Sequence, residues 1–307
     1  MRDKLQRINL ELTSRCNYAC VGCPTHELIR GKGSMEVELY KAIFDEVGND
    51  LNRIFLWGYG EPLLHPRITE LLRYTGNFSA KKIMSTTGWK LEDLSDIESL
   101  TALDELIISI NGITPKVYSQ HQMHGDLEKV IRGLVRVSPV LRDSETRFIM
   151  QMVAHKGNID KIIQAEDFAR EYGFDMLVVK SFNVMDKKQD TFDRFVPLGT
   201  TYSRYQKGLN DAPKKPQNGI YPCEEWMVIN WDGSVNPCCW DYKGEYNFGN
   251  VGELGVQGVW SNFIASRHRN QIRQGKFLDI CVDCANSKTV QTKLLTNKGG
   301  EDVKKSI

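Results

Sequence analysis

The eight cysteines of this 307-residue chain form two groups that lie far apart in the sequence. Cys16, Cys20 and Cys23 lie near the start, and no cysteine occurs between residues 24 and 222. The second group consists of Cys223, Cys238, Cys239, Cys281 and Cys284. Cysteines that only fill a core would be spread more evenly, so the distribution predicts two metal sites at opposite ends of the chain.

The first group has the spacing C-x3-C-x2-C on one short loop. Three thiolates suit an iron–sulfur cubane in which one iron keeps an open position for a substrate or cosubstrate. A structural zinc ion normally takes four ligands and begins with C-x2-C pairs. We therefore favour a [4Fe–4S] cluster on Cys16, Cys20 and Cys23, with zinc and simple packing as the alternatives.

The elements that must position these groups alternate between strand and helix patterns. Apolar runs predict strands at residues 7–12, 52–57, 81–86, 105–110, 146–153 and 175–181. Apolar residues between them recur at helical spacing, as in Met35, Leu39, Ile43 and Val47. This order, repeated about six times, predicts an α/β fold with a parallel sheet, either doubly wound or curled into a barrel. A hairpin is predicted further on, around Asp232–Gly233.

The cysteine loop and the residues after the next strands resemble the radical S-adenosylmethionine (SAM) superfamily, whose core is a partial (β/α)6 TIM-like barrel. Gly58-Tyr59-Gly60-Glu61-Pro62 is similar to the family's GGEP element, which holds the methionine amino group. The resemblance implies SAM-binding residues at successive strand ends, namely Tyr59, Gly60, Glu61, Ser85, Thr86, Ser109, Asn111, Gln151 and Lys180. Gly22 departs from the family, in which the residue before the third cysteine is often aromatic and packs on adenine.

The resemblance also implies the chemistry of the first cluster. Its open iron would chelate SAM, and one electron from the reduced cluster would release a 5′-deoxyadenosyl radical that removes a substrate hydrogen atom. A flavodoxin or ferredoxin-type protein would supply that electron.

The second group resembles the SPASM/twitch domains that follow some radical SAM cores, built from a β-hairpin plus a helix. The resemblance implies an auxiliary [4Fe–4S] cluster on Cys223, Cys238, Cys281 and Cys284, with a zinc site on the same four as the alternative. The domains expected from the resemblance are a radical SAM core at 1–182, a connector at 183–222, the SPASM/twitch domain at 223–290 and a polar tail at 291–307.

This assignment gives Cys239, the fifth cysteine of the group, no role as a ligand. It is a buried thiol beside the cluster, a ligand in place of Cys238, or a hydrogen-atom donor to a substrate radical. A radical epimerase needs such a donor, whereas a radical dehydrogenase does not.

The substrate is expected to be small. A single auxiliary cluster together with Y-G-E-P-L-L resembles the aminocyclitol (2-deoxy-scyllo-inosamine) dehydrogenase type, which implies a sugar, aminocyclitol or nucleotide-sugar. The cysteine loop begins at residue 16 and leaves no space before it for a leader-binding domain. We favour two-electron oxidation of a carbinol with the auxiliary cluster as electron acceptor. Epimerisation through Cys239 and ribosomal-peptide modification are the alternatives, and a non-catalytic metal-binding module is disfavoured.

Charge and composition exclude some partners and compartments. Forty basic residues against 39 acidic ones give a net charge of +1, which disfavours nucleic acid and membrane surfaces as partners. Residues 1–15 lack the apolar stretch of a signal peptide, and no run approaches the ~18–20 apolar residues of a spanning helix. We therefore expect a cytoplasmic protein, whose cysteines do not form a disulfide framework in that reducing compartment.

Overall fold

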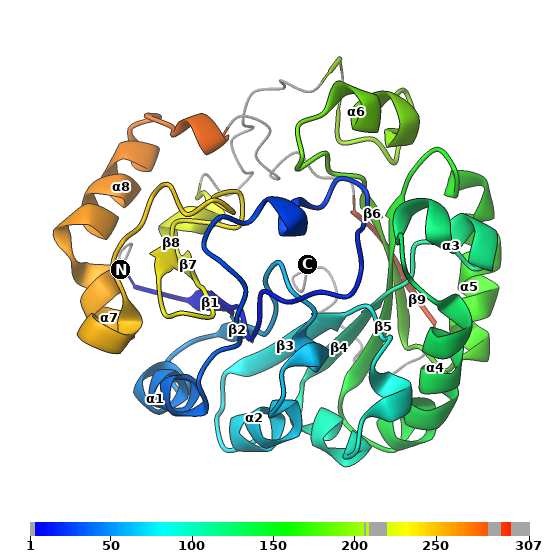
Figure 1. Cartoon of the computed structure of the whole chain (residues 1–307), viewed down its shortest axis with the longest axis horizontal. Helices are drawn as coiled ribbons and strands as arrows, with labels where there is room; N and C mark the ends of the chain where they lie inside the picture. Colours follow the sequence, from blue (N-terminus) through cyan, green and yellow to red (C-terminus); the bar gives the residue numbers. More distant parts are fainter. Residues whose placement is uncertain (1–3, 206, 209–219, 282–289, 296–307) are drawn as a thin grey trace. The chain divides into compact units, whose positions relative to one another are not determined.

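The computed structural model describes residues 4–205, 207–208, 220–281 and 290–295, which belong to two compact units (Figure 1). The first unit comprises Met1–Cys16, Pro24–Met84 and Asn210–Ser287, and the second comprises Asn17–Cys23, Ser85–Leu209 and Lys288–Ile307. Among the described residues, no helix is long and apolar enough to cross a membrane.

The first unit is built around parallel strands with one antiparallel addition. Its strands are β1 (Arg7–Leu10), β2 (Arg53–Phe55), the first part of β3 (Lys81–Thr86), β7 (Trp226–Ile229) and β8 (Val235–Asn236). They are ordered β8-β7-β1-β2-β3, and only the β7–β8 pair is antiparallel. The predicted hairpin is thus present, and its first strand extends the sheet beside β1. Because β1 lies between β2 and β7, the carboxyl ends of these three parallel strands meet at one edge.

Among the described residues of the first unit, four helices cover the strands. They are α1 (Val37–Val47), α2 (Ile68–Thr75), α7 (Val251–Ser261) and α8 (Phe263–Arg273), with short 3-10 turns at Pro24–Glu27, Pro62–Leu64, Pro222–Glu224 and Asp279–Cys281. Helix α1 buries Tyr40 and Phe44 completely. Its Glu46 carboxylate accepts the N–H groups of Val256 and Gln257, each at 2.8 Å. These contacts fasten α7 to α1 just after Gly255, whose φ of 70° interrupts the helix.

The second unit contains parallel strands β4 (Glu105–Ser109), β5 (Arg147–Ala154) and β6 (Met176–Ser181). Helices α3 (Pro115–His121), α4 (Leu127–Arg142), α5 (Ile162–Glu171) and α6 (Gln189–Phe195) connect and follow them, with 3-10 turns at Leu91–Asp93, Ile97–Ala102 and Ile159–Lys161. Strand β9 (Val290–Leu294) pairs antiparallel with β6 in the region where the sequence predicted a polar tail. This pairing satisfies backbone groups on the edge of β6 that a tail would leave uncovered.

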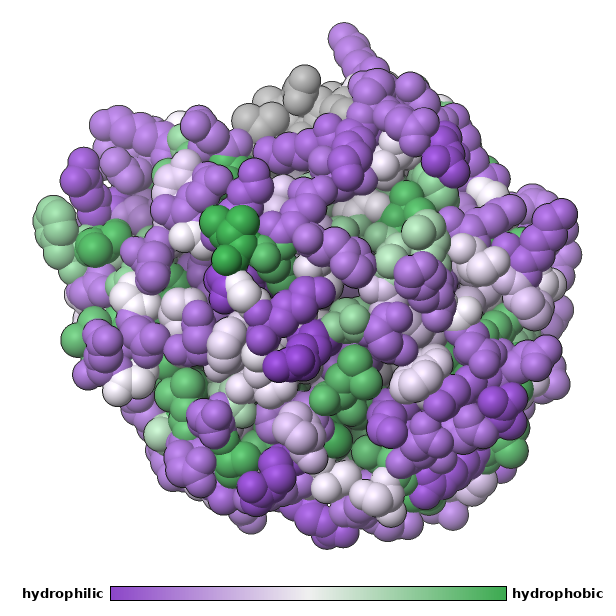
Figure 2. Space-filling model, in the orientation of Figure 1, coloured by the Kyte–Doolittle hydropathy of each residue, from purple (hydrophilic) through white to green (hydrophobic). Residues whose placement is uncertain are grey.

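All six strands predicted in the N-terminal part are present, with bounds within two residues of those predicted. Four of the first five are followed by a longer helix before the next strand, and α6 follows β6 within the predicted connector, so the α/β prediction with a parallel sheet is confirmed. The interior of the second unit contains apolar packing, with Phe148 and Phe174 stacked at 4.1 Å between ring centroids. On the face seen in Figure 2, hydrophobic side chains occur in small groups among hydrophilic ones.

Candidate functional site

The loop that carries the first cysteines is fastened through its backbone. In the second unit, Ala19 N–H donates to the Met123 carbonyl at 3.0 Å and Val21 N–H donates to the His121 carbonyl at 2.9 Å. Cys23 N–H donates to the Cys20 carbonyl at 3.1 Å. Cys16 and Cys20 are half-buried and Cys23 is exposed. The loop backbone is therefore held at the end of α3 and just beyond it.

Gly22 explains the departure from the family pattern. Its φ of +79° lies in the left-handed region, and an added Cβ would lie 3.1 Å from the Phe182 ring and 3.3 Å from the Asn183 carbonyl oxygen. A side chain at this position would be strained by the backbone and crowded by Phe182. The aromatic residue of the family is thus replaced by glycine, and the buried Phe182 ring lies against the loop.

The Gly58–Pro62 loop packs against the residues that precede Cys16. An added Cβ on Gly60 would lie 2.0 Å from the Thr13 carbonyl oxygen, so the close approach requires glycine. Glu61 N–H donates to the Arg15 carbonyl at 2.8 Å. The Glu61 side chain is buried, and its Oε1 accepts Leu63 N–H at 3.1 Å at the start of the Pro62–Leu64 turn. The structure therefore gives Glu61 a capping contact, and its predicted role toward SAM stays a prediction.

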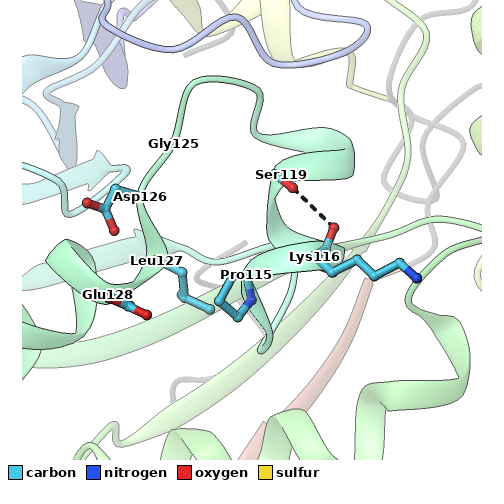
Figure 3. A pocket seen from close by; sticks show the side chains of 7 residues that line it. All are labelled: Pro115, Lys116, Ser119, Gly125, Asp126, Leu127 and Glu128. Carbon is cyan, nitrogen blue, oxygen red and sulfur yellow. Dashed lines mark hydrogen bonds between the residues drawn. The ribbon is translucent and has the colours of Figure 1, made fainter.

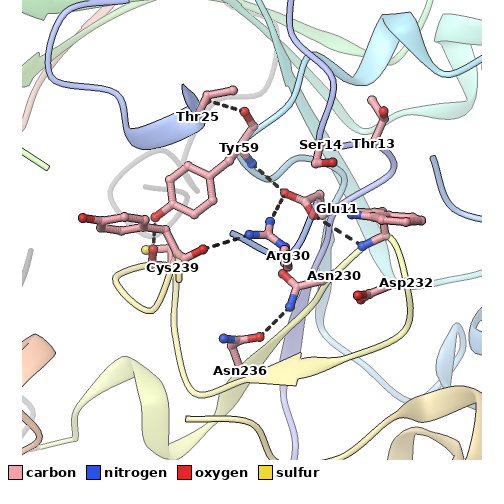
Figure 4. A network of polar contacts seen from close by, with 12 residues as sticks. Glu11, Thr13, Ser14, Thr25, Arg30, Tyr59, Asn230, Asp232, Asn236 and Cys239 are labelled. Atoms are coloured by element: carbon pink, nitrogen blue, oxygen red, sulfur yellow. Dashed lines mark hydrogen bonds and ion pairs between the residues drawn. The ribbon is translucent and has the colours of Figure 1, made fainter. Parts of the chain in front are cut away.

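A buried ion pair lies beside this loop, directly after β1 (Figure 4). Glu11 Oε1 accepts a hydrogen bond from Arg30 at 2.5 Å and from Tyr59 N–H at 3.0 Å. Its Oε2 accepts Trp231 N–H at 3.4 Å, and Arg30 also donates to the Tyr242 carbonyl at 2.9 Å. We call Glu11, Arg30, Tyr59, Trp231, Tyr242 and Cys239 the Glu11 network, because the Tyr59 hydroxyl donates in turn to the Cys239 carbonyl.

Sequence reasoning missed Glu11 and Arg30. The signal for Glu11 is an acidic residue within the apolar run R-I-N-L-E-L, since a charge placed among core positions needs a buried partner. Nothing local to the sequence identifies Arg30 as that partner.

The predicted auxiliary ligands Cys223, Cys238 and Cys281 are half-buried, as is Cys239. Cys284 lies outside the described residues. Within the described chain, no group of three or more His, Cys, Asp or Glu side chains is gathered closely enough to hold a metal ion. The donor chemistry fits iron, because each group supplies thiolates. Which residues bind each cluster stays a prediction.

Two acidic residues near the second cysteine group have structural partners. Asp241 is buried, and its oxygens accept the N–H groups of Glu245 and Tyr246 at 2.8 and 2.9 Å. Glu224 is buried and bonds to Arg273 at 2.9 Å. These contacts stabilise the turns that carry the cysteines, and they argue against either carboxylate as a base toward substrate.

Four predicted SAM-binding residues lie on strands of the second unit or just after one. Ser109 ends β4 and pairs in register with Gln151 of β5, whose amide donates to the Ser109 hydroxyl at 3.5 Å. Asn111 is buried and its Oδ1 accepts Val153 N–H at 2.7 Å. Lys180 lies on β6, one strand further along, and burial lowers its pKa to about 8. The topology thus brings Ser109, Gln151 and Lys180 to one edge, whereas Asn111 faces the protein interior.

Asn111 belongs to what we call the histidine–amide network, formed by Asn111, His121, Gln122, His155 and Asn158. Its Nδ2 lies 2.8 Å from His121 Nδ1, and its N–H donates to Gln122 Oε1 at 2.8 Å. Asn158 Nδ2 donates to the Asn111 carbonyl at 2.9 Å and to the Val153 carbonyl at 2.8 Å. Asn158 Oδ1 accepts His155 N–H at 2.8 Å.

The two histidines of this network are neutral. Burial, and after it the neighbouring His155, lower the pKa of His121 to about 3. Burial lowers the pKa of His155 to about 4. A neutral His121 lets Nδ1 accept from the Asn111 amide, as the geometry requires. Sequence reasoning missed Gln122 and Asn158, for which the chain offers no local signal.

Ser85 and Thr86 end β3. Thr86 is buried and its hydroxyl accepts Gly88 N–H at 3.0 Å, whereas Ser85 is half-buried. Thr86 therefore stabilises the turn after β3, and Ser85 is the more accessible of the two.

A pocket of about 470 Å³ lies between α3 and α4 (Figure 3). Its lining includes Lys116, Ser119 and Asp126 and none of the predicted site residues. The Ser119 hydroxyl donates to the Lys116 carbonyl at 3.2 Å, and Asp126 accepts Lys129 N–H at 3.0 Å as the cap of α4. Because these polar atoms form hydrogen bonds within the helices or at their caps, the pocket gives no indication of a catalytic or binding role.

Two protein-family profiles match the chain. Residues 10–169 match the profile described as the Radical SAM superfamily. Residues 223–285 match the SPASM profile, described as an iron–sulfur cluster-binding domain.

The similarity to two curated proteins extends over nearly the whole chain. The tungsten-containing aldehyde ferredoxin oxidoreductase cofactor-modifying protein of Pyrococcus furiosus is 23% identical, over 92% of this chain and 87% of that protein. The S-adenosyl-L-methionine-dependent 2-deoxy-scyllo-inosamine dehydrogenase of Niallia circulans is 24% identical, over 94% and 96%. The crystal structure of Streptococcus suis SuiB bound to S-adenosylmethionine has a TM-score of 0.66 at 15% identity, covering 92% of this chain and 72% of SuiB. At this identity the structural match shows the fold alone.

Proposed function

Because this chain belongs to the radical SAM superfamily and carries a C-terminal SPASM iron–sulfur domain, we propose that it oxidises a carbinol of a small sugar, aminocyclitol or nucleotide-sugar by two electrons. Its cofactors are a SAM-binding [4Fe–4S] cluster, SAM and an auxiliary iron–sulfur cluster. The observation that carries the proposal is the match to a SAM-dependent dehydrogenase over 94% of this chain and 96% of that enzyme. A match of that extent covers the core and the auxiliary domain together.

The residues of this chain that would hold the cofactors are the predicted ones. Cys16, Cys20 and Cys23 would bind the first cluster, and Cys223, Cys238, Cys281 and Cys284 the auxiliary one. When bound, the first cluster and SAM supply a 5′-deoxyadenosyl radical that removes a hydrogen atom from the substrate. The predicted SAM contacts are the Gly58–Pro62 loop, expected at the methionine end, and Ser109 and Gln151, which lie on β4 and β5.

Oxidation of a carbinol also requires a group that takes the hydroxyl proton. Lys180 is our candidate, because it lies at the end of β6 and burial lowers its pKa to about 8, so that a substantial neutral fraction exists near that pH. Asp241 and Glu224 are disfavoured by their structural contacts. The hydrogen atom, the proton and the second electron would thus leave toward SAM, Lys180 and the auxiliary cluster respectively.

The proposal is tested with anaerobically prepared enzyme, dithionite, SAM and 2-deoxy-scyllo-inosamine deuterated at its carbinol carbons. We expect deuterium in 5′-deoxyadenosine, and a ketone product that has lost one deuterium and one hydrogen. Cys16→Ala should abolish 5′-deoxyadenosine formation, whereas Cys239→Ala should still turn over.

Other outcomes identify other reactions. Solvent deuterium in a product of unchanged composition, lost in Cys239→Ala, would establish epimerisation. Absence of 5′-deoxyadenosine in the iron-loaded wild-type protein would reject radical chemistry. If 5′-deoxyadenosine forms while aminocyclitols and sugars are unchanged and a peptide is modified, the substrate class is wrong.

A further inference from the structure

The Glu11 carboxylate joins three segments that are far apart in the sequence of the first unit. It accepts from Arg30 at 2.5 Å, from Tyr59 N–H at 3.0 Å and from Trp231 N–H at 3.4 Å. The Glu11 side chain is 1% exposed and that of Arg30 is 10% exposed. Nothing in the proposed reaction uses this ion pair, so its position calls for another explanation.

The surrounding glycines show that the chain makes room for this carboxylate. An added Cβ on Gly58 would lie 2.5 Å from Glu11 Cγ, and one on Gly33 would lie 2.2 Å from the Trp231 ring. The loop that carries Tyr59 therefore approaches Glu11, and the Trp231 ring approaches the backbone at Gly33, more closely than a residue with a side chain would permit.

Tyr59 is held at both ends. Its backbone N–H donates to Glu11, and its hydroxyl donates to the carbonyl of Cys239 (Figure 4). Its ring also meets that of Tyr242 edge-on, with 6.0 Å between centroids. One side chain thus connects the predicted SAM-binding loop, Gly58–Pro62, with the backbone of the predicted auxiliary-cluster segment, Cys238–Cys239.

We propose that Glu11 and Tyr59 are positioning residues that couple SAM binding at Gly58–Pro62 to the order of the auxiliary-cluster segment Cys238–Cys239. The inference rests on the proposed function for the roles of the two segments. When SAM orders the loop, Tyr59 holds the Cys239 backbone in one position. By linkage, an ordered Cys238–Cys239 segment strengthens SAM binding by the same factor.

Hydrogen exchange of the iron-loaded enzyme, with and without SAM, tests the coupling. In the wild type, SAM should slow exchange in peptides covering 58–62 and in peptides covering 238–242. In Tyr59→Phe, which removes only the hydroxyl, SAM should still protect 58–62 but no longer protect 238–242. SAM should also bind about five- to tenfold more weakly, the lower range of typical coupling between sites.

Tyr74→Phe is the matched control, because Tyr74 is another tyrosine of the first unit whose hydroxyl donates to a partner, Asp45 at 2.5 Å, at an exposed position. It should behave as the wild type in both peptides. Glu11→Gln is the second variant, since it keeps the side-chain size while removing the charge. It should weaken SAM protection in both peptides, and iron content measured in parallel confirms that each sample carries its clusters.

The results separate the coupling from the proposed function. If SAM protects 58–62 and 5′-deoxyadenosine forms, but protection of 238–242 is absent in the wild type or unchanged in Tyr59→Phe and Glu11→Gln, the coupling is wrong while radical chemistry stands. If SAM protects neither segment and no 5′-deoxyadenosine forms, both proposals are overturned. If the coupling is seen but no carbinol is oxidised, only the proposed reaction is wrong.

Discussion

The two units use different electrostatics to hold the loops that follow their strands. In the first unit, the Glu11 network is built around a buried ion pair. In the second unit, the histidine–amide network contains no charged group, because the pKa values of both histidines are far below neutral. Each network lies beyond the carboxyl ends of parallel strands, where a barrel of this family places its chemistry.

The difference predicts which changes destabilise the loops of each unit. A buried ion pair is stable only while both charges are present, since one remaining charge has neither its partner nor water. A neutral network tolerates burial well but depends on every donor meeting an acceptor and on the histidines staying unprotonated. The first unit should therefore be sensitive to removal of a single charge, and the second to removal of an amide or to low pH.

The largest effect is expected for Arg30→Met. It leaves Glu11 buried with its two backbone donors but without a counter-charge, which should lower the free energy of unfolding by about 3–5 kcal/mol. Urea unfolding followed by circular dichroism measures the loss. The double variant Arg30→Met with Glu11→Gln should recover part of it, because no unpaired charge remains.

Arg194→Met is the control for that experiment. Arg194 pairs with Asp190 at 3.2 Å, with both side chains more than half exposed. Its loss should change stability by at most about 1 kcal/mol. Equal losses of unfolding free energy for Arg30→Met and Arg194→Met would show that burial does not increase the contribution of an ion pair to stability.

The next effect is a loss of stability at mildly acidic pH, to which His121 and His155 of the second unit contribute, as does His268 of the first, whose pKa burial lowers to about 4. Native His155 has its pKa lowered to about 4, and native His121 to about 3, whereas unfolded histidines titrate near 6.5. As the pH falls below 6.5, the unfolded chain binds protons that the native histidines cannot take, so stability falls until about pH 4 for His155 and about pH 3 for His121. Each histidine contributes up to about 1.4 kcal/mol per pH unit.

His155→Asn checks this origin, because an asparagine oxygen can replace Nδ1 as the acceptor for Gly157 N–H, which lies at 3.1 Å. The urea midpoint of this variant should fall less between pH 7 and pH 5 than that of the wild type. Parallel profiles for the two proteins would show that the acid sensitivity arises elsewhere.

Asn158→Ala should cost about 1–3 kcal/mol, the usual range for buried groups left unsatisfied. It removes the acceptor of His155 N–H and the donor to the carbonyls of Asn111 and Val153. The loss should be independent of pH between 7 and 9, unlike the histidine effect. A loss below 0.5 kcal/mol, within the range of ordinary surface substitutions, would mean that water replaces the amide.

The smallest effect is expected for Gly22→Ala compared with Gly31→Ala. Both glycines have φ near +78°, but only Gly22 faces Phe182, whereas Gly31 has no neighbour within 4 Å of an added Cβ. The backbone strain of about 1–2 kcal/mol should therefore be common to both, with a further loss for Gly22. Identical midpoints for the two variants would show that Phe182 moves aside freely.

Much of the fold follows from local patterns, because strand and helix periodicity depend on neighbouring residues. The strand Lys81–Thr86 has the predicted bounds. The pairing of β7 with β1 joins residues more than 200 positions apart and has no local signal. The same holds for β9 beside β6, which replaces the start of the expected tail.

The candidate site, like the fold, was predicted only in part from the sequence. Cysteine spacing predicts two iron–sulfur sites, and the profile matches to a radical SAM core and an iron–sulfur domain support both. Strand order brings Ser109 and Gln151 together as expected, since residues at the ends of neighbouring parallel strands share an edge. Asn111 was predicted from the same reasoning, but it lies two residues beyond Ser109, after the end of β4, where its side chain is buried and accepts Val153 N–H.

The amino-acid sequence alone determined which residues could carry the chemistry, because thiolate spacing and glycine positions act over a few residues. Only the tertiary structure decided that Glu11 pairs with Arg30, that Tyr59 reaches Cys239, and that Asp241 supports a turn. Each of these contacts depends on where a distant segment is folded, and burial then favours the contact, since a polar group left unpaired inside costs free energy.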